Sequence, residues 1–150
     1  MNKQPLIDHR KGSSHLQVLG TQVRFLCEAH QTQGAFSMME VQLPRDSGPP
    51  PHHHDWDEAY YIADGQVRFT IGDQVSLVSA GDFVYAPAGT IHGFTGVSET
   101  PSRVLILDAP AHAAGFFKEV DREVRSLPDD GPKVPEIGAR HGVHFLPLPN

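Results

Sequence analysis

Apolar and polar residues alternate in a series of short segments through the first two thirds of the chain. Val67, Phe69 and Ile71, for example, are separated by polar residues. The same period recurs in residues 15–19, 22–27 and 103–108, and residues 35–43 form a longer strand-like run. A two-residue period places alternate side chains on one face of a β-strand. Roughly eight to ten short strands at this spacing predict an antiparallel sandwich or barrel.

The pattern changes after residue 110. Four apolar residues recur at helical spacing with charged residues between them: Phe116, Phe117, Val120 and Val124. This spacing predicts a helix. Residues 128–132 are rich in proline and aspartate and predict a linker, whereas residues 136–141 predict a short helix that ends at Gly142.

These patterns divide the chain into three parts. Residues 1–14 are polar and are expected to be flexible. Residues 15–110 are expected to form a single β-barrel, and residues 111–150 a helical and extended tail that packs on it. A chain of 150 residues is expected to form one domain, and no internal repeat indicates a second barrel.

Two stretches, residues 48–65 and 81–92, carry the candidate metal chemistry. They contain three imidazoles and one carboxylate: His52, His54, Glu58 and His92. The first three occupy even-numbered positions, which an unbroken strand would aim at one face, although a bulge at 55–57 would shift the register. Such a set suits one divalent transition metal, either iron, manganese, nickel, copper, cobalt or zinc, rather than calcium or magnesium.

Each motif taken alone is less specific. A His-x-His pair by itself is more often part of a solvated loop, and His53, between two inward-facing rings, is expected to face solvent. The carboxylate of Glu58 and the second motif ending at His92 together favour metal ligation by the four residues as a set.

Aromatic residues near the two motifs are candidates for a substrate pocket. Tyr60 shares the parity of the ligands and would either contact a substrate or fill the core. Phe83, Tyr85 and Phe94 would line an aromatic pocket or pack inside the barrel, and both interpretations stay open. Trp56 is expected at the rim of the site or at an interface.

The two motifs resemble those of the cupin superfamily. The first motif of that family is matched by Gly48, His52, His54, Glu58 and Gly65, with Gly48 two residues nearer to the first histidine than usual. The second is matched by Gly81, Pro87, Gly89 and His92, and its terminal asparagine is replaced by Gly96. The wider chain is most similar to small single-domain cupins (monocupins) that resemble quercetin dioxygenases. The resemblance implies an all-β double-stranded β-helix, or jelly-roll barrel, with a short C-terminal helical tail.

The resemblance also implies a function, a metal-dependent dioxygenase acting on a small aromatic or enolisable substrate. In such enzymes the residue matched by Glu58 is both a ligand and a proton acceptor, so Glu58 is the expected catalytic residue. A non-catalytic ligand-binding or sensor protein and a sugar isomerase or epimerase stay open as alternatives. An aromatic-lined mouth would favour the dioxygenase, whereas polar or charged residues around the metal would favour sugar chemistry. A homodimer is expected by the same resemblance.

Composition narrows the range of partners. The net charge of −6 gives no electrostatic case for nucleic-acid binding. Cys27 is the single cysteine, which fits a reducing compartment. The first residues lack the apolar segment of a signal peptide, and the longest aliphatic run, residues 104–107, is too short to span a membrane. We therefore expect a cytoplasmic protein with a small-molecule substrate and neither a nucleic-acid nor a membrane partner.

Overall fold

Two antiparallel sheets face each other in the computed structural model, which describes residues 3–10 and 14–147. The first sheet has the order β1-β2-β3-β10-β5-β8 and is built from β1 (Leu16–Val18), β2 (Thr21–Cys27), β3 (Ser37–Leu43), β5 (Asp57–Asp64), β8 (Phe83–Ala86) and β10 (Ser102–Ala109). The second has the order β11-β4-β9-β6-β7 and is built from β4 (His52–His53), β6 (Gln66–Ile71), β7 (Gln74–Ser79), β9 (His92–Gly96) and β11 (His144–Phe145). The predicted all-β jelly-roll barrel with a short helical tail is therefore confirmed.

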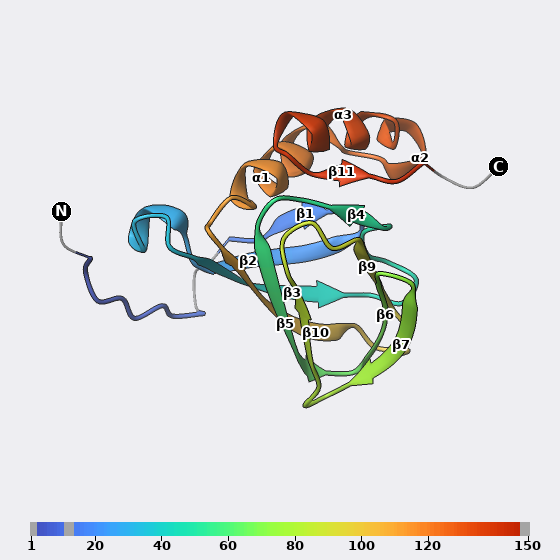
Figure 1. The fold of residues 1–150 in the computed structure, drawn as a ribbon, viewed down its shortest axis with the longest axis horizontal. Coiled ribbons are helices and arrows are strands. Elements are labelled where there is room, and N and C mark those ends of the chain that lie inside the picture. The colour runs from blue at the N-terminus through green and yellow to red at the C-terminus, as the bar shows by residue number, and fades with distance from the viewer. Residues whose placement is uncertain (1–2, 11–13, 148–150) are drawn as a thin grey trace.

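The C-terminal helices are stacked over one end of this barrel (Figure 1). The helical elements are a 3-10 turn, η1 (Ala29–Gln31), and α1 (Ala114–Glu123), α2 (Leu127–Asp130) and α3 (Lys133–Arg140). The linker predicted for residues 128–132 is wrong, because α2 occupies its first half. Pro128 lies in the first turn of α2, where a missing N–H costs nothing, and the Asp130 carboxylate accepts hydrogen bonds from the amides of Arg125 and Ser126. Among the described residues, none of the helices has the length and apolarity that crossing a membrane requires.

The core lies between the two sheets and follows the alternation read from the sequence. In β10 every second residue is fully buried, from Ser102 to Asp108. Within the second sheet, the rings of the cross-strand partners Phe69 and Phe94 stack with their centroids 5.2 Å apart, and Tyr60 of the first sheet meets Phe69 edge to face across the core. Burial of each such side chain contributes about 1.5–3 kcal/mol to the free energy of unfolding.

The strand that carries the first motif crosses from one sheet to the other. β4 ends at His53 in the second sheet, a bend follows, and β5 begins at Asp57 in the first sheet. Even-numbered side chains stay buried through the bend, so the crossing does not shift the parity. Ligand candidates that are close in sequence therefore face each other from opposite walls of the barrel. Gly48, with φ of 132°, allows the chain leading into β4 to pass against the Phe94 carbonyl, where any side chain would collide.

Hydrogen bonds attach the tail to the barrel near its start and near its end, in addition to contacts along α1. At its start, buried Asp108 accepts hydrogen bonds from the Ser37 hydroxyl and from the amides of His112 and Ala113, just before α1. At its end, β11 pairs with β4, placing Phe145 opposite His52.

The N-terminal segment also contacts the first sheet. Asp8 pairs with the buried guanidinium of Arg24 at 2.6 Å, and Arg10 pairs with Glu40 at 2.9 Å. The expected flexibility of residues 1–14 stays a prediction, and residues 1–2 and 11–13 of that segment lie outside the described residues.

Candidate metal centre

Three imidazoles converge inside the barrel at the end covered by the tail. His52 lies on β4, His54 follows in the bend, and His92 begins β9, where it pairs directly with His52. One nitrogen of each ring lies within 4.8 Å of the others. All three side chains are buried, with at most 7% of any of these residues exposed. The two motifs, separated in sequence, thus form one nitrogen-donor cluster.

The hydrogen bonds of these rings leave their inner nitrogens free. Each Nδ1 contacts a backbone carbonyl two residues away, at 2.8 Å for His52, 3.1 Å for His54 and 2.8 Å for His92. An Nδ1–H that donates to a carbonyl leaves Nε2 as an unprotonated acceptor, the arrangement that orients metal-ligating histidines.

The Nε2 atoms of His54 and His92 are fully buried and have no hydrogen-bond partner among the described residues. A buried polar atom left unsatisfied costs about 1–3 kcal/mol. A divalent transition metal would satisfy these atoms, and neutral imidazole nitrogens are donors that such ions prefer. The residues present therefore fit a metal ion.

Glu58 lies on β5, on the wall opposite His52. Its Oε1 is 3.1 Å from His54 Nε2 and its Oε2 is 3.6 Å from His92 Nε2, although neither contact has hydrogen-bond geometry. The Tyr60 hydroxyl donates to Oε2, and Trp56 Nε1 donates to Oε1 at 3.4 Å. The carboxylate is thus held in place beside His54 and His92, but it does not lie within ligand range of all three imidazoles, and its role as a fourth ligand stays a prediction.

The charge state of this carboxylate follows from its neighbours. Burial acts to raise the pKa of Glu58, but the adjacent His54 and His92 rings lower it by more, so that the pKa lies well below its ordinary value. Burial of the ring, together with the charge of the same carboxylate, raises the pKa of Tyr60 well above its ordinary value. Glu58 is therefore an anion at neutral pH and Tyr60 a neutral hydrogen-bond donor.

An apolar cavity of about 50 Å³ lies between the metal centre and the tail, and His52, His54 and Glu58 of the centre line it. Tyr60 and Phe94 line it, as does Trp56. The tail supplies five further wall residues: Ala113, Phe116, Phe117, Val143 and Phe145. Among the residues that the structure describes, no lysine or arginine lines the cavity.

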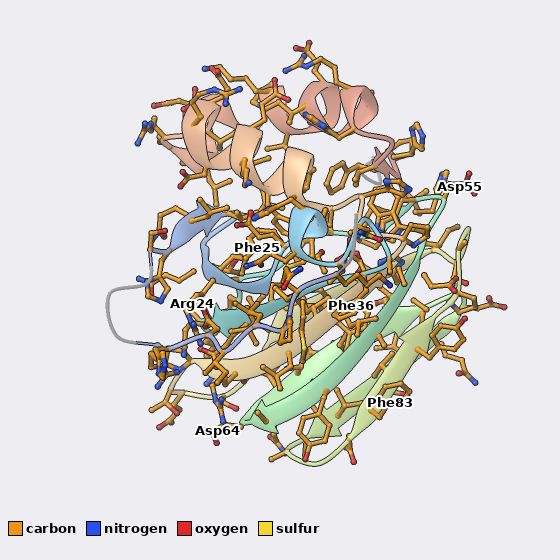
Figure 2. All side chains as sticks on the ribbon, turned by 90° about the vertical axis from the view of Figure 1, so that its left-hand side faces the viewer. Arg24, Phe25, Phe36, Asp55, Asp64 and Phe83 are labelled. Atoms are coloured by element: carbon orange, nitrogen blue, oxygen red, sulfur yellow. The ribbon has the colours of Figure 1, made fainter. Side chains whose placement is uncertain are left out.

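Two of the aromatic residues expected in the pocket lie elsewhere. Phe83 and Tyr85 are 64% and 51% exposed on the edge strand β8, and neither lines the cavity. Figure 2 shows Phe83 on the outside of the strands, far from the tail. The inward-facing Tyr60 pairs with Val84, so the odd-numbered residues of β8 face outward. All four residues of this strand are apolar or aromatic, and the sequence therefore did not reveal which pair faces inward.

Trp56 corrects a second expectation, because it is neither at the rim nor at an exposed surface. It is 5% exposed, and its ring stacks on that of His54 with centroids 4.0 Å apart and planes within 7°. Its even number, shared with the ligands, is the signal that would have placed it inside. The contribution of the tail residues to the cavity left no comparable signal in the sequence.

Comparisons with known proteins agree with this geometry. A cupin-domain family model matches residues 38–108. An uncharacterized protein of Streptomyces coelicolor is 33% identical over 91 residues, which cover 61% of this chain and 81% of that protein. The quercetin 2,3-dioxygenase of Bacillus subtilis is 26% identical over 96 residues, 63% of this chain but 28% of the enzyme. The chain thus spans less than a third of that enzyme's length.

Solved structures share the fold at lower identity. KdgF from Halomonas sp. matches with a TM-score of 0.65 and 22% identity, covering 71% of this chain and 94% of that one. The predicted oxalate decarboxylase of Thermotoga maritima matches with a TM-score of 0.65 and 18% identity, and the match covers 70% of this chain and 99% of that one. The polyketide cyclase RemF from Streptomyces resistomycificus matches with a TM-score of 0.62 and 21% identity, and the match covers 71% of this chain and 80% of that one. At these identities the likeness shows the fold alone. The two motifs, the barrel, the imidazole cluster and the matching family model together show that the chain belongs to the cupin superfamily.

Proposed function

We propose that this chain is a metal-dependent dioxygenase that acts on a small aromatic or enolisable substrate. The observation that carries the proposal is a three-imidazole centre, two of whose rings line a cavity with apolar and aromatic walls. Among the described wall residues that lie away from the centre, Thr21 alone has a polar side chain. Its hydroxyl already donates a hydrogen bond to the Val18 carbonyl. The similarity to a quercetin 2,3-dioxygenase supports the same class of reaction.

The bound metal would act as a Lewis acid toward a substrate hydroxyl or enol oxygen and, if redox-active, would allow reaction with dioxygen. Glu58 is placed to accept the proton of that hydroxyl, because it is ionised and lies beside the imidazole nitrogens. Tyr60 and Trp56 hold the carboxylate in position by hydrogen bonds to its two oxygens. A positioned general base of this kind contributes about 10²–10⁴ to the rate.

The cavity walls determine which substrates are favoured. A carboxylate or phosphate would find no lysine or arginine among the described wall residues and would have the metal ion alone to offset its charge, which disfavours anions that extend into the apolar part of the cavity. A sugar would bring several hydroxyls to walls that offer few hydrogen-bonding groups. The aromatic residues Phe94, Phe116 and Phe145 instead suit a flat, uncharged ring and keep bulk water from the reacting atoms.

The test is oxygen uptake by protein loaded separately with Fe²⁺, Mn²⁺, Co²⁺ and Ni²⁺, assayed against flavonols, β-diketones and catechols. We expect uptake and ring or carbon–carbon cleavage products with at least one metal and one substrate class. Glu58→Gln is the matched variant and should lower the rate while leaving the fold intact. Quenching of Trp56 fluorescence measures binding in the same samples. Tight binding without oxygen uptake for every metal would contradict the proposal and favour a ligand-binding protein.

A further inference from the structure

Two further imidazoles face each other on the outside of the barrel, behind the metal centre. His53 follows His52 on β4 and points to the opposite face of the strand. His144 is its direct partner on β11, and the two ring centroids lie 5.2 Å apart with planes inclined by 34°. Among the described residues, neither ring makes a hydrogen bond or an ion pair. Both imidazoles are thus available to a ligand.

The separation of these two rings matches that of imidazoles on one metal ion. With a metal–nitrogen distance near 2.1 Å, each ring centroid lies about 3.2 Å from the ion, so two centroids are about 4.6–5.2 Å apart for angles between 90° and 109°. In the inner centre the corresponding separations are 4.4, 4.9 and 5.7 Å. The pair of His53 and His144 therefore falls within the range of the inner set.

The surroundings of the pair can complete a coordination shell. A surface pocket beside it gives water access to both rings and is lined by His53, His54, Asp55, Trp56, Gly89, Gly142 and His144. The Asp55 carboxylate does not form a three-ligand group with the two rings, so water molecules would complete the shell. Figure 2 shows Asp55 at the end of the strands that lies next to the C-terminal helices. Two imidazoles with water ligands suit zinc, copper, nickel or cobalt. We propose that His53 and His144 form a second, peripheral site for a divalent transition metal, distinct from the inner centre.

A metal ion bound at this site would attach the tail more firmly to the barrel. β11 is two residues long and contacts the barrel through β4, with the Leu146 amide bonded to the Pro51 carbonyl at 3.1 Å. An ion shared by the two strands would join them, and would hold Phe145 against His52 with their ring centroids 5.4 Å apart. The peripheral metal would thereby stabilise the closed roof of the cavity. The site requires no assumption about the reaction catalysed inside.

The first test is metal stoichiometry. Untagged full-length protein, stripped with a chelator, is titrated with Zn²⁺ and the bound zinc is measured after gel filtration. We expect two equivalents in the wild type and one in His53→Ala and in His144→Ala. His30→Ala removes an exposed imidazole that has no ring partner and should retain two.

A further variant separates the two sites. His92→Gln should lose the inner equivalent and keep the peripheral one, so failure of one site is distinguishable from failure of the other. A wild type whose single equivalent persists in His144→Ala and is lost in His92→Gln would overturn the proposal. So would a second equivalent that persists in His144→Ala, because that result would indicate adventitious binding elsewhere.

The second test measures the attachment of the tail by hydrogen exchange at the Leu146 amide. The inner centre is filled first with one equivalent, and further Zn²⁺ is then added. Free metal at ten times its dissociation constant should slow exchange through local opening by about tenfold. His144→Ala should show no slowing. Exchange in the wild type that is insensitive to the second equivalent would contradict the proposed link between the site and the roof.

Discussion

Asp108 provides the sharpest mutational test of how the tail is held over the metal centre. Its side chain is fully buried, at 0% exposure, and it is the acceptor for three donors: the Ser37 hydroxyl and the amides of His112 and Ala113. Those two amides come immediately before α1, whose residues Phe116 and Phe117 form part of the cavity roof. Loss of this acceptor should therefore loosen the roof.

The expected loss of unfolding free energy follows from the hydrogen-bond donors that Asp108→Ala would leave unsatisfied. Asp108→Ala orphans the buried Ser37 hydroxyl and the buried Ala113 amide, each at about 1–3 kcal/mol, together with the part-buried His112 amide, so the free energy of unfolding should fall by about 3 kcal/mol or more. Burial raises the pKa of Asp108, so the ionised carboxylate itself carries a desolvation cost. Asp108→Asn avoids that cost, keeps a carbonyl for the two amides and turns an N–H toward Ser37. It should lose about 1 kcal/mol or less.

Urea denaturation followed by circular dichroism and by Trp56 fluorescence measures both effects. Trp56 is the chain's only tryptophan, and its ring meets that of His112 at 5.8 Å, so its emission reports on the start of the tail. We expect the midpoint of Asp108→Ala to fall by about 1 M or more relative to Asp108→Asn. Equal losses in the two variants, or a harmless Asp108→Ala, would refute the assigned role.

Three other perturbations have expected outcomes. Glu58→Gln should keep the fold, weaken metal occupancy measured by elemental analysis, and lower turnover by about 10²–10⁴-fold; unchanged occupancy would show that the carboxylate is not a ligand. Phe116 is a wall residue that is 5% exposed, so Phe116→Ala should lower the free energy of unfolding in urea by about 3–4 kcal/mol and should admit bulkier substrates. The control Phe83→Ala, at an exposed position, should change the free energy of unfolding by about 0.5 kcal/mol or less. Burial and the charge of His92 lower the pKa of His52 to about 4 in the metal-free protein, so between pH 6.5 and pH 4 the unfolded chain binds a proton that the folded chain does not. Stability should therefore be complete above pH 6.5 and should decrease by roughly 3 kcal/mol toward pH 4, with a flatter profile in His52→Gln; a flat wild-type profile would count against a neutral, buried His52.

The barrel and the metal centre could be predicted because their signals are local. A two-residue period marks the strands, and the parity of His52, His54 and Glu58 survives the crossing between sheets. The same parity applied to Trp56 would have placed it against His54. For Phe83 and Tyr85 the parity carried no information, because their neighbours in β8 are also apolar.

The roof of the cavity could not be predicted because its contacts join distant segments. Helical spacing identified α1, but nothing in residues 144–146 indicated that this segment would add a strand beside β4. The anchor at Asp108 depends on a register in which β10 lies between β3 and β5, bringing Ser37 beside it. A single sequence does not specify that pairing. At Pro128 the sequence predicted a linker where the structure has a helix, because proline is common both in linkers and in the first turn of a helix.

The binding of one metal ion by the three imidazoles is tested most directly by anomalous diffraction from crystals of the full chain grown with one equivalent of a transition metal. A metal ion bound at this centre should give one strong peak inside the barrel, about 2.0–2.2 Å from the Nε2 atoms of His52, His54 and His92. An empty inner centre, or a peak bound only by other residues, would contradict it.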